Sequence, residues 1–454
     1  MTMAFALILL VVGTVLFHFL SPWWFTPIAS NWGMMDSTVN LTFWVTGVVF
    51  VAVNLFMAYV VYRYRHRTDG QPQARAHYEP ENKKLEWWLT GVTTVGIAAL
   101  LAPGLVVWAK FVTVPNDAAV VEVLGQQWNW SYRFPGKDGV LGTTGAHQIS
   151  VNNPFGMNPD DPKGYDDILV SSPELHLPID KPVKLLLRSK DVNHQFVVPQ
   201  FRVKMDMVPG MVTYVWLTPT RSGGFDAVCE QLCGMPHFSM RGRVVVDTAS
   251  DFATWLSGQR TYAQMRSEIA GDASAGQALY TVCATCHGAE GQGNRELNAP
   301  KLSGQSSWYL NKQLQNFKHG VRGANDQDVY AKQMSPFAAM LADDDAVRNV
   351  VAYIATLPES RPAPTVLGNP ARGKQLYTNC AVCHGGMGQG VWATNAPRLS
   401  NMSDWYLERQ LQNFKLGIRG NHPQDFNGAQ MASMAKALSD DTSIKDLLDY
   451  VHTL

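Results

Sequence analysis

Residues 283–287 read Cys-Ala-Thr-Cys-His, and residues 380–384 read Cys-Ala-Val-Cys-His. Each stretch is the C-x-x-C-H sequence to which a c-type haem is attached. The two cysteines bond the vinyl groups of the porphyrin, and the histidine becomes the proximal ligand of the iron. The sequence therefore predicts two covalently bound haems c. The residues expected to hold them are Cys283, Cys286, His287, Cys380, Cys383 and His384.

The two motifs belong to a longer repeat with a constant offset of 97 residues. Trp-Tyr-Leu at 308–310, for example, recurs at 405–407. Two copies are too few for a solenoid, so the repeat indicates the tandem duplication of one small domain. We expect these domains at residues 270–359 and 368–454. The proline-rich stretch 358–370 is then a semi-rigid spacer between them.

A c-type haem that transfers electrons needs a sixth iron ligand, and methionine raises its potential. Met334 and Met431 each follow the proximal histidine of their copy by 47 residues. A single methionine is more often a flexible core residue, but this matched spacing favours axial ligation. Met340 and Met434 are rivals, although neither has a methionine counterpart in the other copy.

Over nearly all of residues 270–454 the two copies resemble small class I cytochrome c domains, which are all-α. The resemblance implies that the carbonyls of Pro300 and Pro397 face the proximal histidines, although a plain loop proline fits the sequence as well. Because haem is attached on the outer side of the bacterial inner membrane, we expect this half of the chain to face the periplasm.

The chain has six cysteines, and the two outside these motifs lie in residues 229–240, Cys-Glu-Gln-Leu-Cys-Gly-Met-Pro-His-Phe-Ser-Met. In an oxidising compartment a disulfide is the simplest interpretation of such a pair. Two thiolates, an imidazole and a thioether so close together are also a soft ligand set suited to copper. A further histidine, His194, stands upstream of this stretch.

This set resembles the binuclear copper (Cu-A) centre of cytochrome c oxidase subunit II, and the resemblance runs from residue 41 to about residue 247. It rests also on Gln-Trp-Asn-Trp-Ser-Tyr at 127–132 and on Lys-Met-Asp-Met-Val-Pro-Gly at 204–210. The copper ligands that it implies are His194, Cys229, the backbone carbonyl of Gln231, Cys233, His237 and Met240.

Three further expectations follow from the resemblance. The family usually has Glu at Gln231, where the side chain reaches a magnesium site shared with subunit I. An amide is a weaker ligand for a hard cation, so the magnesium contact is in doubt. Trp128 occupies the position where electrons enter from cytochrome c, or it is an ordinary core tryptophan. Glu86 matches the residue at the mouth of a proton channel in subunit I, or it is a helix N-terminal carboxylate favoured by the dipole.

The copper-binding region is expected to be all-β. Short runs rich in Val, Leu, Phe, Tyr and Trp alternate with turn signals such as Val-Pro-Gly-Met at 208–211. They predict a domain over residues 111–255 that resembles a cupredoxin, a Greek-key β-sandwich with its metal loop at one end. Residues 248–270 are expected to form a helical connection to the first haem domain.

The first 110 residues are expected to anchor the chain in the membrane. The runs 41–62 and 87–109 are almost free of charge, and each is long enough as a helix, roughly 33 Å, to cross a bilayer. They form a transmembrane hairpin over 41–110. The loop between them is cytoplasmic by the positive-inside rule, which places everything after it outside. Its basic residues are Arg63, Arg65, Arg67, Arg75, Lys83 and Lys84. Within residues 1–40, the apolar run 3–20 is an extra transmembrane helix or a signal peptide.

Composition agrees with a membrane-anchored chain, because only 16% of residues are charged and 11% are aromatic. The formal net charge is zero, so overall electrostatics name no partner. The sequence shows no phosphate loop, no nucleophile constellation and no sign of nucleic-acid binding.

The sequence is thus interpreted as subunit II of a proton-translocating cytochrome c oxidase with two fused cytochrome c domains. Electrons pass from a periplasmic c-type cytochrome or other soluble donor, through two haems c and the copper pair, to subunit I. That partner carries haem and copper B and reduces oxygen, so no catalytic residue is expected here. Subunit III and membrane lipid are the other expected partners, in a bacterial inner membrane.

Two alternatives stay open. A copper A nitric oxide reductase would use a similar copper subunit with a different catalytic partner. A stand-alone membrane-anchored electron-transfer protein would have no catalytic partner at all. A quinol oxidase subunit II lacks the copper ligands, so Cys229 and Cys233 argue against it.

Overall fold

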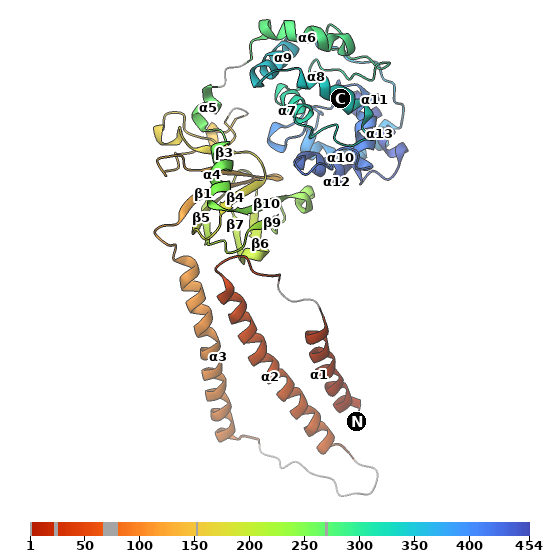
Figure 1. Cartoon of the computed structure of the whole chain (residues 1–454). Coiled ribbons are helices and arrows are strands. Elements are labelled where there is room, and N and C mark those ends of the chain that lie inside the picture. Colours follow the sequence, from red (N-terminus) through yellow and green to blue (C-terminus); the bar gives the residue numbers. More distant parts are fainter. Residues whose placement is uncertain (1, 22–25, 67–79, 151–152, 268–270) are drawn as a thin grey trace.

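The computed structural model describes residues 2–21, 26–66, 80–150, 153–267 and 271–454. Figure 1 shows three long helices that extend to one side of a β-sandwich, and two helical domains on its other side. This is the expected fold class: apolar N-terminal helices, a cupredoxin-like all-β domain and two all-α domains.

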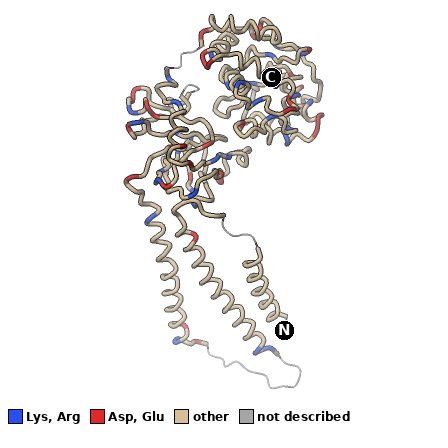
Figure 2. Tube along the Cα trace, in the orientation of Figure 1, with Lys and Arg blue, Asp and Glu red and all other residues tan. Residues whose placement is uncertain are grey.

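The three N-terminal helices are long and apolar enough to cross a membrane, by length and composition. They are α1 (Thr2–Leu20), α2 (Gly33–Arg63) and α3 (Lys83–Val112). In Figure 2 the middles of these helices carry almost no charge, and basic side chains lie at the ends of α2 and α3 remote from the sandwich. Arg67 and Arg75 of the basic loop lie outside the described residues.

Helix α2 begins at Gly33, ahead of the apolar run expected from residue 41. Its polar first turns are stabilised by Asp36, a carboxylate near the positive end of the helix dipole. Asp36 also accepts from the Arg202 guanidinium of the sandwich at 2.7 Å. Residues 33–40 therefore belong to the helix and not to the segment before it, and they lead it onto the sandwich.

The sandwich consists of two five-stranded sheets, with strand orders β3-β2-β1-β5-β8 and β4-β10-β9-β6-β7. Neighbouring strands are antiparallel except for β1 with β5 and β4 with β10. The strands are β1 (Ala119–Gln126), β2 (Asn129–Phe134), β3 (Ile168–Val170), β4 (Glu174–Pro178), β5 (Val183–Ser189), β6 (His194–Val198), β7 (Val203–Met207), β8 (Val212–Leu217), β9 (Gly223–Cys229) and β10 (Arg241–Asp247).

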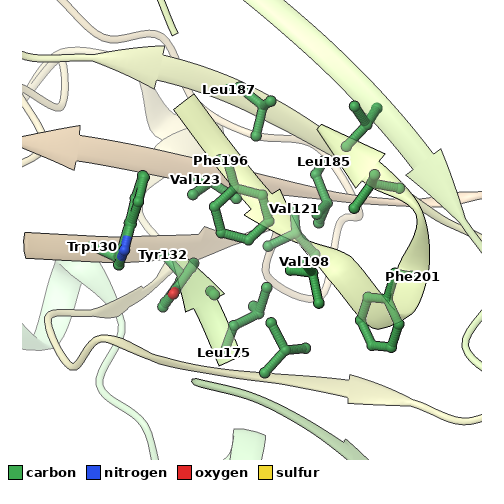
Figure 3. Close-up of a cluster of buried hydrophobic side chains, with 14 of the residues drawn as sticks. Val121, Val123, Trp130, Tyr132, Leu175, Leu185, Leu187, Phe196, Val198 and Phe201 are labelled. Carbon is green, nitrogen blue, oxygen red and sulfur yellow. The ribbon is translucent and has the colours of Figure 1, made fainter. Parts of the chain in front are cut away.

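The core lies between the two sheets. In β5 every second side chain from Val183 to Leu187 is buried, as expected for a strand with one face on the core. Figure 3 shows Leu185 and Leu187 of this strand beside Phe196 and Val198 of the opposite sheet. The rings of Phe196 and Trp130 lie edge to face, 5.3 Å apart. This packed interior holds the ends of β6 and β9 in fixed positions.

The segment before α2 is part of this domain. Trp32 is 1% exposed, and its indole Nε1 donates to the carbonyl of Trp216 at 2.9 Å. Its ring lies edge-on to Trp216 at 4.8 Å and also contacts Phe111, at the end of α3. Trp32 therefore joins both ends of the membrane hairpin to the sandwich.

Two short helices, α4 (Ala249–Ser257) and α5 (Tyr262–Ser267), follow β10, so the expected helical connection is confirmed up to residue 267. Residues 268–270 of that connection lie outside the described part. Short 3-10 turns are η1 (Ala146–Gln148), η2 (Pro162–Gly164), η3 (Pro199–Phe201), η4 (Met235–Ser239) and η5 (Trp392–Thr394).

The two helical domains repeat one helix order. The first has α6 (Ala273–His287), α7 (Ser307–Lys318), α8 (Val329–Ala339) and α9 (Asp344–Thr356). The second has α10 (Pro370–His384), α11 (Asp404–Lys415), α12 (Phe426–Ala435) and α13 (Asp441–Thr453). The first and last helices of each domain cross closely, at Gly276 in α6 and at Gly373 in α10. Side-chain caps from Asp272 and Asn369 start the two motif helices.

The linker between the helical domains is anchored to the second one. The carboxylate of Asp404 accepts from the backbone N–H groups of Thr365 and Val366 at 2.6 and 2.9 Å, and from the Thr365 hydroxyl at 2.7 Å. The end of the linker is therefore held by α11.

Candidate metal centres

The expected copper ligands converge on one end of the sandwich. β9 ends at Cys229, the following loop contains Cys233 and His237, and β10 begins directly after Met240. The Sγ atoms of Cys229 and Cys233 lie 3.8 Å apart, and both cysteines are free thiols. The structure therefore forms no disulfide between them.

The other expected ligand atoms surround this pair of sulfurs. The Sγ of Cys233 lies 3.4 Å from Nδ1 of His237 and 3.8 Å from Sδ of Met240. The Sγ of Cys229 lies 3.3 Å from the carbonyl oxygen of Gln231 and 3.9 Å from Nδ1 of His194. The side chain of Gln231 itself is exposed. Soft donors from two strands and one loop thus face a common point, and this donor set fits copper.

His194 is oriented by a carboxylate. Its Nε2 lies 2.8 Å from Asp191 Oδ1, which leaves Nδ1 directed at the sulfurs. Asp191 also accepts from the backbone N–H of Gln127 at 2.7 Å. Such a second partner fixes the tautomer and the orientation of a metal-binding imidazole. The hydrogen bond between the two thiols lowers the pKa of Cys229 and raises the pKa of Cys233, so the pair readily loses one proton and the Cys229 sulfur is the one that becomes a thiolate.

Each C-x-x-C-H motif forms the end of a helix, so that its histidine points into the domain. Nδ1 of His287 lies 2.8 Å from the carbonyl oxygen of Pro300, and Nδ1 of His384 lies 2.7 Å from that of Pro397. The expectation for the two prolines is confirmed. Burial lowers the pKa of both histidines. Each is then a neutral imidazole whose Nδ1–H donates to the carbonyl and whose Nε2 is available to a metal.

The second helical domain contains a cavity with mainly apolar walls, and both cysteines and the histidine of the C-x-x-C-H motif of this domain line it. Cys380, Cys383 and His384 line it together with Met431 and Met434. Apolar walls around two thiols, one imidazole and a thioether fit a covalent haem. The buried Nε of Arg419, which also lines the cavity, has no protein partner there.

The expected axial methionines occupy equivalent helices. Met431 in α12 packs against the core of the second domain, and Met334 in α8 packs against Phe317. Of their rivals, Met434 lines the same cavity as Met431, whereas Met340 is 66% exposed. The assignment of Met334 and Met431 stays a prediction.

A buried polar network joins the two helical domains. Arg322 donates to the Tyr406 hydroxyl at 2.7 Å, and Arg419 donates to the Tyr309 hydroxyl at 3.0 Å. Each arginine also donates to a glutamine of its own domain and to one of the other domain; these are Gln313 and Gln410. The six residues of this network recur in the sequence at the 97-residue offset of the repeat, as Tyr309 and Tyr406, Gln313 and Gln410, and Arg322 and Arg419, but the recurrence alone does not show that they meet across the two domains.

Trp128 lies beside residues 230–240, the loop between β9 and β10 that carries Cys233, His237 and Met240 and is called the copper loop below. It is 4% exposed and belongs to the sandwich core, and its indole Nε1 donates to the carbonyl of Cys233 at 3.1 Å. The ring therefore packs as a core residue and also touches the backbone of an expected copper ligand. Glu86 lies elsewhere, exposed in the first turn of α3 and at the end of that helix remote from the sandwich.

Comparison with known proteins agrees with this architecture. Residues 119–249 match the family of the cytochrome c oxidase subunit II periplasmic domain, and residues 273–358 and 370–454 each match the cytochrome c family. The chain is 59% identical over 263 residues to the alternative cytochrome c oxidase subunit 2 of Bradyrhizobium diazoefficiens, a match that covers 58% of this chain and 94% of that protein.

Solved structures resemble single parts of the chain. The periplasmic domain of subunit II of cytochrome oxidase of Bradyrhizobium japonicum is 26% identical, with a TM-score of 0.24, and the match covers 32% of this chain and 95% of that one. Cytochrome c4 of Pseudomonas stutzeri is 28% identical, with a TM-score of 0.33, over 41% of this chain and all of that one. Because the match covers nearly the whole length of the Bradyrhizobium diazoefficiens relative, and because the three domain matches agree with it, the chain belongs to the cytochrome c oxidase subunit II family, with two cytochrome c domains fused at its C-terminal side.

Proposed function

We propose that this chain is the electron-input subunit of a proton-translocating cytochrome c oxidase. It takes electrons from a c-type donor and delivers them to subunit I, which reduces oxygen to water. The observation that carries the proposal is the convergence of four potential ligands, His194, the Gln231 carbonyl, His237 and Met240, on the paired thiols of Cys229 and Cys233. A purely structural loop has no need for two free, buried cysteines facing two imidazoles and a thioether.

When bound, a copper pair and two haems c supply centres that accept and release one electron at a time. The protein supplies their positions. A copper pair would be held by Cys229, Cys233, His194, the carbonyl of Gln231, His237 and Met240. The haems are held by Cys283 and Cys286, and by Cys380 and Cys383. Their iron ligands are His287 with Met334, and His384 with Met431.

The proposed domain division is a copper domain over 111–255 and cytochrome c domains over 270–359 and 368–454. The chain lies in a bacterial inner membrane with these domains in the periplasm, in a complex with subunits I and III. Glu86, at the opposite end of α3, is then on the cytoplasmic side, where it contributes to proton uptake by subunit I. The exposed side chain of Gln231 faces subunit I. It offers an amide in place of the carboxylate expected at the shared magnesium site.

The test is to purify the intact complex through a tag on this chain and to measure its turnover. Cyanide-sensitive oxygen uptake with a reduced c-type donor is the expected result, and the double variant Cys229→Ser, Cys233→Ser is expected to lack it while retaining covalent haem. Anaerobic consumption of nitric oxide with negligible oxygen uptake would assign the chain to a nitric oxide reductase. Purification without a large haem-containing subunit would indicate a stand-alone electron carrier.

A further inference from the structure

The second cytochrome c domain lies directly on the copper loop. α12 packs against η4, and the side chain of Gln430 in α12 donates to the backbone carbonyl of Trp128. Trp128 and Pro236, both from the sandwich, form part of the wall of the cavity that contains Cys383. Cys383 itself packs against the sandwich core. Figure 1 shows α10 and α12 on the side facing the sandwich, and α6 at the opposite end of the pair of domains.

A second set of contacts lies beside the first. The amide of Gln126 in β1 donates to the carbonyl of Ala393 at 3.0 Å. The ammonium of Lys190 donates to Gln126 at 3.0 Å and sits over the ring of Trp392, 4.7 Å from its centroid. The cation–π contact and the hydrogen bond from Gln126 hold η5 of the second domain against the sandwich, while the bond from Lys190 to Gln126 fixes the two sandwich side chains that make these contacts.

The repeat shows why only the second copy fits here. The residues of the first domain that correspond to Trp392 and Ala393 are Arg295 and Glu296, and both are exposed. An arginine at the position of Trp392 would place a positive charge against Lys190 and would remove the aromatic ring. The part of the docking surface formed by Trp392 and Ala393 is therefore specific to the second domain, whereas Gln430 has an identical counterpart, Gln333, in the first.

We propose that the second cytochrome c domain is the direct electron donor to the copper loop, and that Gln430 and Trp392 are positioning residues that hold it over Trp128. The inference rests on the proposed function and adds an order to it: the external donor reduces the first domain, the first reduces the second, and the second reduces the copper loop. In the last step one electron would move from the haem of the second domain to the copper pair of the copper loop, and no bond forms or breaks. Trp128 is covered by this domain, so a soluble donor does not reach it.

The experiment exchanges the docking pair between the two copies. The variant Trp392→Arg, Ala393→Glu gives the second domain the residues of the first, and Arg295→Trp, Glu296→Ala is the matched control. Gln430→Glu is a second variant, which leaves the fold of η5 untouched and sets a carboxylate against the Trp128 carbonyl. Each is studied in the intact complex after rapid reduction of its haems c. The rate of copper reduction is followed optically, and hydrogen exchange is followed at residues 126–130 and 426–434.

We expect copper reduction to slow by about tenfold or more in both docking variants, because a like-charge contact or a lost hydrogen bond opens the interface. Exchange should rise at both segments, with haem and copper spectra unchanged. The control should match the wild type in both measurements. Wild-type rates in both docking variants, or equal slowing in the control, would overturn the inference. A wild-type complex without copper would instead refute the proposed function.

Discussion

Replacement of Gly373 by alanine tests how the second haem domain is held together. An added Cβ at Gly373 in α10 would lie 1.9 Å from the carbonyl oxygen of Asp446 and 2.8 Å from Cβ of Tyr450, both in α13. Carbon atoms normally approach such neighbours to about 3.5 Å. A backbone carbonyl cannot rotate away, so α13 has to move by more than an ångström, and the packing of both helices is lost at this crossing.

The cost can be estimated from two opposing effects. Overpacking a close contact costs about 1–3 kcal/mol, and the rigid backbone neighbour places this site at the upper end. Alanine recovers up to about 1 kcal/mol over glycine in a helix. The net loss is about 2 kcal/mol, which corresponds to about a thirtyfold larger open population at roughly 1.4 kcal/mol per factor of ten.

Native-state hydrogen exchange measures this population helix by helix. We expect amides of α13 to exchange about thirtyfold faster in Gly373→Ala, while α9 in the first domain serves as an internal reference and stays unchanged. Gly386→Ala is the control in the same domain, because a Cβ there has no neighbour within 4 Å. The reasoning is refuted if α13 exchanges at the wild-type rate, or if α9 responds as strongly as α13.

Three further predictions concern the sandwich, the copper loop and the linker. Trp32→Ala should cost about 4 kcal/mol of sandwich stability through the cavity that it leaves. Trp32→Phe should cost only about 1 kcal/mol through the lost hydrogen bond to Trp216. Equal urea midpoints for the two variants would contradict the role of Trp32 as a core residue of the sandwich. Asp191→Asn should lower copper affinity about 10–100-fold, because His194 loses its charged partner, and unchanged copper retention against a chelator would exclude this. Burial raises the pKa of Asp404, but the hydrogen bonds that its carboxylate accepts from the linker outweigh this, so the pKa lies below its usual value. The stability that this carboxylate contributes is therefore present above the unfolded-state pKa, about 4, and is lost as the pH falls through the lowered folded-state pKa. Asp404→Asn should remove this part of the acid dependence of the melting temperature.

Local patterns in the sequence were sufficient to find the chemistry. The two C-x-x-C-H motifs carry the haem cysteines and the proximal histidines, and residues 229–240 carry every expected copper ligand except His194. The apolar runs predict helices because a membrane span needs only length and hydropathy. Pro300 and Pro397 could be anticipated through the resemblance to cytochromes c, and their contacts with the histidines are confirmed.

Contacts between distant segments could not be predicted in this way. Nothing in the sequence distinguishes Trp32 from a tryptophan at the membrane surface, yet it is a core residue of a sandwich whose strands begin more than 80 residues later. The bond from Gln430 to Trp128 joins two domains and follows no periodic pattern. Such contacts depend on how folded surfaces fit each other, which local propensity and spacing do not encode.

The copper content of the purified complex tests the central claim most directly. The claim is that the thiols of Cys229 and Cys233 hold a copper pair at the end of β9. Metal analysis and covalent-haem absorbance, measured on the wild type and on the double variant Cys229→Ser, Cys233→Ser, should show a loss of two coppers per complex at unchanged haem c. Equal copper in both proteins would contradict the account.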